Sequence, residues 1–202
     1  MSGFEFLRTD SDGAVARSPM ERQAQAAGAR FEVRDGWNVA VAYSGEASSA
    51  PVAWADVSHL AKVEVHGPHE FALRQASRAN ASWRCPVTRD RVLAIGDRDA
   101  DGLDVTCSFA ALTIVGPAAL EAFARFSALD LRPQSMPIGG FRPGSLARTP
   151  GYVLREDDDR FLMLFGWAVG EYMWTVVADA ATSLGGAPVG VDALDREAAA
   201  RA

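Results

Sequence analysis

The chain has 202 residues, of which 49% are apolar and 23% are charged. This length and composition favour a globular protein of one domain or two small ones, and they exclude a disordered or fibrous chain. The net charge of −6 opposes binding to a nucleic-acid backbone. No apolar run reaches the roughly twenty residues that a membrane span needs, and the first residues lack the layout of a signal peptide, so a cytoplasmic protein is expected.

A short helix is the first element expected. Ser18 is suited to cap it, Pro19 to occupy its first position, and Glu21 to complete a capping box with Ser18. The helix is expected to run to about Ala27, because Gly28 favours the left-handed backbone that ends many helices.

Two strands joined by a tight turn are expected next. Residues 31–33 and 37–43 have strand composition, and the dipeptide Asp35-Gly36 between them is typical of a hairpin turn. The small polar residues 44–50 then predict a loop.

A strand, a glycine and a helix recur three times along the rest of the chain. The expected strands are residues 62–66, 111–115 and 161–165, and the expected helices are residues 70–77, 118–128 and 169–184. Gly67, Gly116 and Gly166 separate each strand from its helix, at spacings of 49 and 50 residues. The near-equal spacing favours repeated β-α-β-β modules with antiparallel sheets, and hence an α+β fold, over a solenoid.

The segments between these units complete the expected layout. A strand pair at residues 91–95 and 103–109 is expected around an acidic turn, and residues 132–150, with four prolines and three glycines, predict a long irregular connection. A single compact domain is expected over residues 17–194. The expected flanks are a flexible N-terminal segment, residues 1–16, and a C-terminal tail, residues 195–202.

No metal site is predicted. Asp97, Asp99 and Asp101 match the opening of a calcium-binding loop, but the later ligand positions of that loop do not match, so a surface turn is expected. His66 and His69 have the right chemistry for zinc, but they fall on different elements on either side of a Gly-Pro dipeptide, which disfavours a shared ion.

A hydrolase and a protein stabilised by disulfide bonds are also disfavoured. Asp56, Ser58 and His59 include the residue types of a catalytic triad, but no nucleophile motif surrounds the serine, so a turn or cap is expected there. Cys85 and Cys107 are too few to staple a chain of this length, and both are expected to be buried, reduced thiols.

Several of these segments resemble one known superfamily. Residues 56–68, Asp-Val-Ser-His-Leu-Ala-Lys-Val-Glu-Val-His-Gly-Pro, and the Ser18-Pro19 helix start resemble the amino-terminal half of the glycine-cleavage aminomethyltransferases, the T-proteins. Residues 114–120, Ile-Val-Gly-Pro-Ala-Ala-Leu, and 171–174, Glu-Tyr-Met-Trp, resemble the gamma subunit of heterotetrameric sarcosine oxidase, a shorter relative. The resemblance spans about residues 17–194. It implies the aminomethyltransferase folate-binding fold, a role in one-carbon metabolism, and tetrahydrofolate as the ligand.

The resemblance also implies site residues. A T-protein motif, Arg-Thr-Gly-Tyr-Thr-Gly-Glu, is matched in part by Arg148-Thr-Pro-Gly-Tyr152 and, further on, by Glu156. A pterin needs a stacked aromatic ring and a carboxylate for its aminopyrimidine edge, which Tyr152 and Glu156 would supply. Arg148 and Arg142 would face the glutamate tail.

One departure from the T-protein pattern decides the expected function. Residues 77–83 stand where T-proteins have Asn-Asp-Val, and they lack the aspartate that contacts folate there. The missing acid favours a noncatalytic subunit that docks on a larger flavin-dependent amine oxidase or demethylase and helps to form a folate pocket.

Two other hypotheses remain open. One is a small tetrahydrofolate-dependent aminomethyl- or methyltransferase that uses Asp56 or Glu156 as a replacement carboxylate. The other is a free-standing folate-binding accessory protein, although neither Cys85 nor Cys107 lies in the Gly-Cys-Tyr-x-Gly-Gln motif of such relatives. Neither nucleic acid nor a membrane is expected as a partner.

Overall fold

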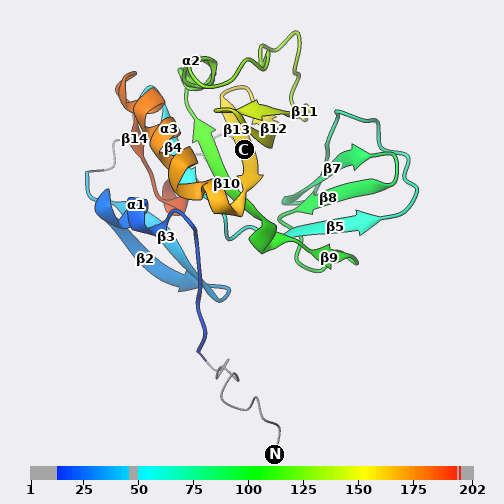
Figure 1. Cartoon of the computed structure of the whole chain (residues 1–202), viewed down its shortest axis with the longest axis horizontal. Helices are drawn as coiled ribbons and strands as arrows, with labels where there is room; N and C mark the ends of the chain where they lie inside the picture. Colours follow the sequence, from blue (N-terminus) through cyan, green and yellow to red (C-terminus); the bar gives the residue numbers. More distant parts are fainter. Residues whose placement is uncertain (1–12, 46–49, 195, 197–202) are drawn as a thin grey trace, which may run out of the picture.

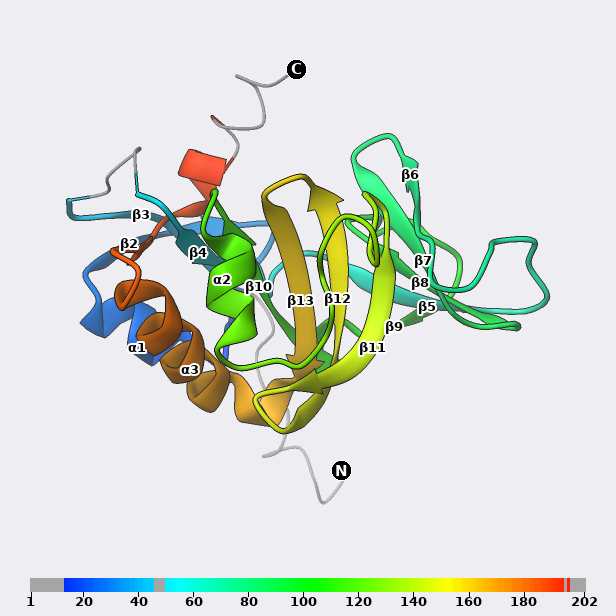
Figure 2. The same ribbon diagram turned by 90° about the horizontal axis from the view of Figure 1, so that it is seen from above.

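The structure is a computed structural model that describes residues 13–45, 50–194 and 196. Residues 1–12 of the expected N-terminal segment lie outside this range, as do most of the expected tail and the centre of the expected loop at 44–50. The described residues form three β-sheets with helices packed on them (Figures 1 and 2). Most strand pairs are antiparallel, so the expected α+β class is confirmed.

The first sheet holds the predicted hairpin. Its elements, with the helix that precedes the hairpin, are β1 (Ala16–Arg17), α1 (Glu21–Ala26), β2 (Ala29–Arg34) and β3 (Trp37–Tyr43). Strands β2 and β3 pair antiparallel, and β1 adds to β3 in parallel. Asp35 and Gly36 both have positive φ values, 49° and 77°, as a tight hairpin turn of this kind requires.

Helix α1 starts later than the sequence predicts. Ser18 caps the turn before the helix: its Oγ accepts the N–H of Met20 at 3.1 Å, and its carbonyl accepts the N–H of Glu21 at 3.2 Å. Glu21 does not complete the capping box, since its carboxylate pairs with Arg17 one turn away. Gly28 has a φ of 85° and ends the helical segment as predicted.

The second sheet is the centre of the molecule. Its strand order is β11-β12-β13-β10-β4-β14. The strands are β4 (Ala53–Asp56), β10 (Phe109–Val115), β11 (Phe141–Leu146), β12 (Thr149–Asp157), β13 (Arg160–Gly166) and β14 (Ala187–Pro188). Helices α2 (Ala119–Ala124) and α3 (Gly170–Thr182) cover one face of it (Figure 2). None of the helices formed by the described residues is both long and apolar enough to cross a membrane.

The third sheet packs toward the opposite face of the central sheet. Its order is β6-β7-β8-β5-β9, and all its pairs are antiparallel. The strands are β5 (Lys62–His66), β6 (Ser77–Ala79), β7 (Ser82–Thr88), β8 (Arg91–Ile95) and β9 (Leu103–Asp104).

Two hydrophobic cores follow from the alternation along the central strands. Leu112 and Ile114 of β10 point into the core beneath α2 and α3, whereas Ala111 and Val115 point into the core shared with β3 and the third sheet. Because both faces of β10 are covered, its residues are almost all buried, and it reads as an unbroken apolar run in the sequence.

Three further sequence expectations about the fold are wrong. Residues 70–77 form no helix, so the first of the three expected modules lacks its α element; the second helix is shorter than expected, and the third is confirmed as α3. Strands β8 and β9 do not pair with each other, because β5 lies between them. Residues 132–150 are not wholly irregular: they contain β11 and the start of β12, joined by a turn at Ala147 and Arg148.

Candidate functional site

The four residues expected to bind folate lie along one strand pair. Arg142 is on β11, directly opposite Val153, and Tyr152 is on β12, directly opposite Pro143. Arg148 precedes β12 and Glu156 lies near its other end, eight residues away, which is about 26 Å for an extended strand. The structure therefore places Arg142 and Tyr152 on neighbouring strands with their side chains on opposite faces of the sheet, and it keeps Arg148 far from Glu156.

Tyr152 belongs to an aromatic cluster on the inner face of the central sheet. Its ring stacks on Phe141, with centroids 5.1 Å apart and planes 8° apart, and it meets the ring of Phe109 edge-on at 6.2 Å. Phe141 is buried and Tyr152 is half-buried. Tyr152 is therefore a firmly held ring that keeps part of its surface open.

Glu156 sits at an irregularity of β12, where the pairing with β13 shifts between Arg155 and Asp157. Its Oε2 accepts a hydrogen bond from Nε of Arg160 at 3.2 Å, and its side chain is 16% exposed. The charge of Glu156 also adds to the effect of burial, the larger cause, in raising the pKa of the Cys85 thiol on the third sheet. Glu156 is therefore a paired carboxylate near the space between the two sheets.

Arg142 links the segments that contain Arg74 and Ser135 through hydrogen bonds. One Nη donates to the carbonyl of Arg74 at 2.6 Å, and the other donates to the carbonyl of Ser135 at 3.0 Å. Both of these bonds end on backbone carbonyls, so the guanidinium keeps its positive charge unneutralised by them.

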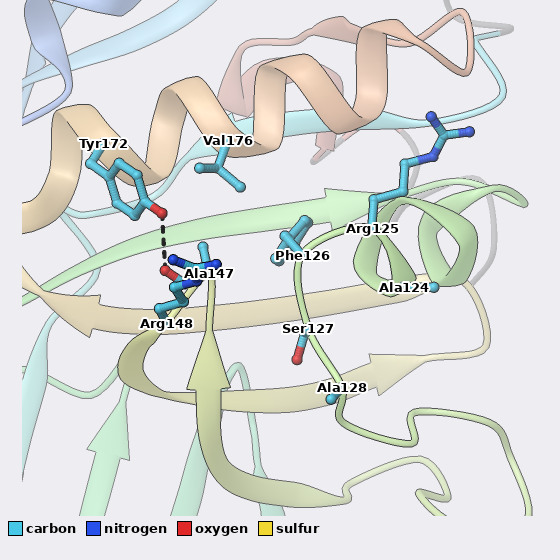
Figure 3. A pocket seen from close by; sticks show the side chains of 9 residues that line it. All are labelled: Ala124, Arg125, Phe126, Ser127, Ala128, Ala147, Arg148, Tyr172 and Val176. Atoms are coloured by element: carbon cyan, nitrogen blue, oxygen red, sulfur yellow. Dashed lines mark hydrogen bonds between the residues drawn. The ribbon is translucent and has the colours of Figure 1, made fainter.

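Arg148 lines an open pocket on the helical face of the central sheet (Figure 3). The pocket has a volume of about 520 Å³, within the usual range for small-ligand sites. It is lined by Ala124, Arg125, Phe126, Ser127, Ala128, Ala147, Arg148, Tyr172 and Val176. This lining contains two arginines and no carboxylate, so it offers positive charge without an acid or base for proton transfer.

The turn that carries Arg148 is strained and braced. Ala147 and Arg148 have φ values of 47° and 66°, a region that residues with a Cβ rarely adopt. The N–H of Ala147 donates to the carbonyl of Phe126 at 2.8 Å, and the hydroxyl of Tyr172 donates to the carbonyl of Ala147 at 3.0 Å (Figure 3). Contacts from two other segments therefore hold this turn in place.

Asp56 and Lys62 form a buried polar cluster where the sheets meet. Asp56 ends β4 and accepts the N–H of Ser58 at 2.9 Å, with further hydrogen bonds from the side chains of Ser18 and Ser58. Lys62 begins β5 with no exposed surface, and its Nζ donates to the carbonyls of Ser58 and Leu60, both at 2.8 Å. Each charged end is thus bound by groups of the chain itself.

Burial sets the protonation of this cluster. It raises the pKa of Asp56 against the lowering effect of the hydrogen bonds from Ser18 and Ser58. It lowers the pKa of Lys62 to about 8, although the charge of Asp56 acts in the opposite direction. It also lowers the pKa of the neighbouring His59 to about 4, aided by the charge of Lys62. His59 is therefore neutral near pH 7. The cluster joins the end of β4 to the start of β5 and has a structural role.

The sequence analysis did not predict the burial of Lys62. Lys62 is the only lysine of the chain. In the alternating stretch 62–66 it is expected on the same strand face as Glu64 and His66, which are more exposed. Its contacts come partly from Thr106, whose Oγ1 accepts the N–H of Lys62 at 3.0 Å from 44 residues away. Only the absence of any other lysine marked this position as unusual.

Other candidate residues have structural partners. Asp97 pairs with Arg84 and accepts the N–H of Asp99 at 3.1 Å, which fits a surface turn. No group of three His, Cys, Asp or Glu side chains suited to a metal occurs among the described residues. Cys85 is a buried free thiol as expected, but Cys107 is exposed, so the expectation that both are buried is wrong for Cys107.

Comparisons with known proteins identify the fold. No protein-family model and no curated protein sequence matches the chain. The heterotetrameric sarcosine oxidase from Corynebacterium sp. U-96, solved in complex with pyrrole 2-carboxylate, contains a chain that matches with a TM-score of 0.65 and 16% identity, over 84% of this chain and 96% of that chain. The glycine cleavage system aminomethyltransferase T from Bartonella henselae matches with a TM-score of 0.70 and 15% identity, over 89% of this chain and 60% of that chain. The protein therefore has the α+β fold common to these two proteins, as the sequence resemblance implies.

Proposed function

We propose that the protein is a noncatalytic subunit or accessory protein of amine and one-carbon metabolism, with a role like that of the sarcosine oxidase gamma subunit. The observation that supports this most is the extent of the structural matches. The match to the sarcosine oxidase chain takes in 84% of this chain and 96% of that chain. The partner in this proposal is a larger, flavin-dependent amine oxidase or demethylase, and the complex is cytoplasmic.

Tetrahydrofolate is the proposed ligand, bound along β11 and β12. In this arrangement Tyr152 packs against the pterin ring, and Glu156 accepts hydrogen bonds from its aminopyrimidine edge. Arg142 and Arg148 attract the carboxylates of the glutamate tail. Tyr152 and Arg148 lie on opposite faces of the central sheet, so a ligand that reaches both passes around its edge at β11.

The acidic residues favour a noncatalytic role. A general acid or base must lie within hydrogen-bond reach of the reacting group. Asp56 is buried and already bound by Ser18 and Ser58, and Glu156 is paired with Arg160. The pocket at Arg148 has no carboxylate in its lining.

A small tetrahydrofolate-dependent aminomethyl- or methyltransferase is the second candidate. Its support is the position of Glu156, whose partly exposed carboxylate lies beside an irregular point of β12 rather than inside a regular strand. Such irregularities often redirect a side chain next to an active site. In this case Glu156 would exchange the proton during one-carbon transfer.

Purification of the protein from its native host distinguishes the two candidates. The subunit proposal predicts a stoichiometric complex with a protein that carries flavin, detected by its visible absorbance and by the mass of the complex. A monomer without a partner contradicts that proposal. If the purified chain alone transfers a one-carbon unit to tetrahydrofolate, the transferase is correct. Calorimetric titration with a reduced folate tests the ligand independently of either outcome.

A further inference from the structure

Residues 70–75 expose two large apolar side chains. All six residues are exposed, and they form neither a helix nor a strand at the outer end of β5 (Figure 2). Phe71 is 40% exposed and Leu73 is 48% exposed. Large apolar side chains gathered on an irregular surface segment are uncommon in proteins that act alone, and they mark interaction sites.

The segment is held firmly against a second segment, residues 137–142, which comprises a turn and the first two residues of β11. The N–H of Phe141 donates to the carbonyl of Arg74 at 2.9 Å, and the side-chain amide of Gln75 donates to the carbonyl of Ile138 at 3.1 Å. The fit is close: a Cβ at Gly139 would lie 2.6 Å from the Gln75 amide. The apolar side chains are therefore presented by a fixed scaffold.

The second segment extends the same surface and adds to its positive charge. Ile138 is 48% exposed, close to residue 75 through the hydrogen bond above. Arg74 is exposed and has a left-handed backbone, with φ at 70°. Arg142 lies beside it and binds its carbonyl. The two segments hold two arginines and one acid, Glu70, so they carry a small net positive charge on a chain whose net charge is −6.

We propose that residues 70–75, together with Pro137, Ile138 and Arg142, form the docking surface for a different protein, whose contact region is apolar and edged with carboxylates. Phenylalanine and arginine are typical of the energetically important centres of interfaces. A symmetric contact with a second copy is disfavoured, because it would bring the positively charged surface of one copy against that of the other. This inference rests on the proposed function, which supplies the partner as a flavoprotein subunit.

The test uses two charge variants and two matched controls. Leu73→Asp and Arg74→Glu alter the proposed surface. Leu103→Asp and Arg98→Glu make the same changes at exposed positions near the opposite edge of the third sheet. Each full-length variant is checked by its melting temperature, and Phe71→Ala replaces Leu73→Asp if that variant does not fold. The probe is the protein that copurifies stoichiometrically with the wild-type chain, isolated and titrated against each variant.

The surface variants are expected to weaken binding at least about 100-fold and the controls less than about threefold. Wild-type affinity is expected to fall as salt rises, and Arg74→Glu to reduce that dependence. If the copurifying protein carries flavin and the surface variants no longer bind it, both proposals are supported. If the stoichiometric partner carries no flavin and the same variants fail to bind it, the docking surface is supported and the proposed function is contradicted. A flavoprotein bound equally by all variants keeps the function and overturns the surface, and the absence of any partner overturns both.

Discussion

The ring of Tyr152 lies parallel to the ring of Phe141, with 5.1 Å between their centroids and 8° between their planes. Phe141 is 1% exposed, so it fixes the tyrosine from below, and Phe109 adds an edge contact at 6.2 Å. The stacked pair restricts the orientation of the Tyr152 ring before any ligand binds. A ligand that packs on Tyr152 would therefore incur little additional loss of side-chain entropy.

Tyr152→Ala is expected to weaken the binding of a reduced folate by about 1–3 kcal/mol, because the aromatic contact is lost. Tyr152→Phe keeps the ring and is expected to bind within about threefold of the wild type. Isothermal titration calorimetry measures both affinities, and thermal melting checks that the alanine variant is folded. Unchanged affinity in Tyr152→Ala would remove Tyr152 from the site.

Arg148→Gly is expected to raise the free energy of unfolding by roughly 0.5–1 kcal/mol. Glycine adopts the left-handed backbone of this turn without the steric cost that Arg148 carries, and this gain exceeds the extra entropy of the unfolded chain. Urea unfolding measures the change.

Arg148→Ala is the matched control, since it removes the guanidinium and keeps the Cβ. It is expected to show no gain in stability. Both variants are expected to bind a reduced folate less tightly, and to the same extent. Equal stability of the glycine and alanine variants would contradict the assignment of strain to this turn.

Stability is expected to depend on the protonation of Lys62 between pH 8 and pH 10.5. Burial lowers the pKa of Lys62 from 10.5 to about 8, so in this range the unfolded chain holds a proton that the folded chain has released. The contribution of Lys62 to the free energy of unfolding therefore rises with pH, by at most about 3 kcal/mol. Below pH 8 both states are protonated and this contribution is constant.

The measurement compares the wild type with Lys62→Met across this pH range. The comparison is needed because burial raises the pKa of Cys85 above 9.0, which lowers stability as the pH rises beyond that value. The difference in unfolding free energy between the two proteins cancels the effect of Cys85. A difference that does not change with pH would show that Lys62 titrates normally in the folded chain.

The elements that the sequence predicted well are those whose signals are local. The turn residues Asp35 and Gly36 predicted the first hairpin, and their positive φ values confirm it. The apolar run 111–115 and the helix near 169–184 also appear as expected, in β10 and α3. Each of these patterns is set by backbone preference or by a long apolar face, which neighbouring elements do not override.

The wrong predictions depended on distant parts of the chain. Residues 70–77 have helical composition, but Phe71 and Leu73 have no core beneath them, and so short a helix is not stable without packing. Pro143 was taken as a sign of irregular structure, yet it lies in β11 at the edge of the central sheet, where a missing N–H is tolerated.

The candidate site was predictable only in part for the same reason. The aromatic and charged residues of β12 were recognised from a motif, but their spread along the strand follows from the pairing of β11 with β12. The burial of Lys62 depends on Thr106, 44 residues away, and the pocket at Arg148 combines residues 124–128 with Tyr172 and Val176 of α3. No local pattern brings these segments together.

The three recurring glycines are expected to differ in how much stability an alanine costs. Gly116 has a φ of 117°, and a Cβ there would lie 2.7 Å from the carbonyl oxygen of Pro51, so Gly116→Ala is expected to cost roughly 2–4 kcal/mol. Gly67 has a φ of 137° but open space, so Gly67→Ala is expected to cost about 1–2 kcal/mol. Gly166 has a φ of −57° and open space, and Gly166→Ala is expected to change stability by no more than about 0.5 kcal/mol. Urea unfolding of the three variants gives this order directly. Equal losses at all three positions would mean that backbone conformation and the contact with Pro51 do not decide where glycine is needed.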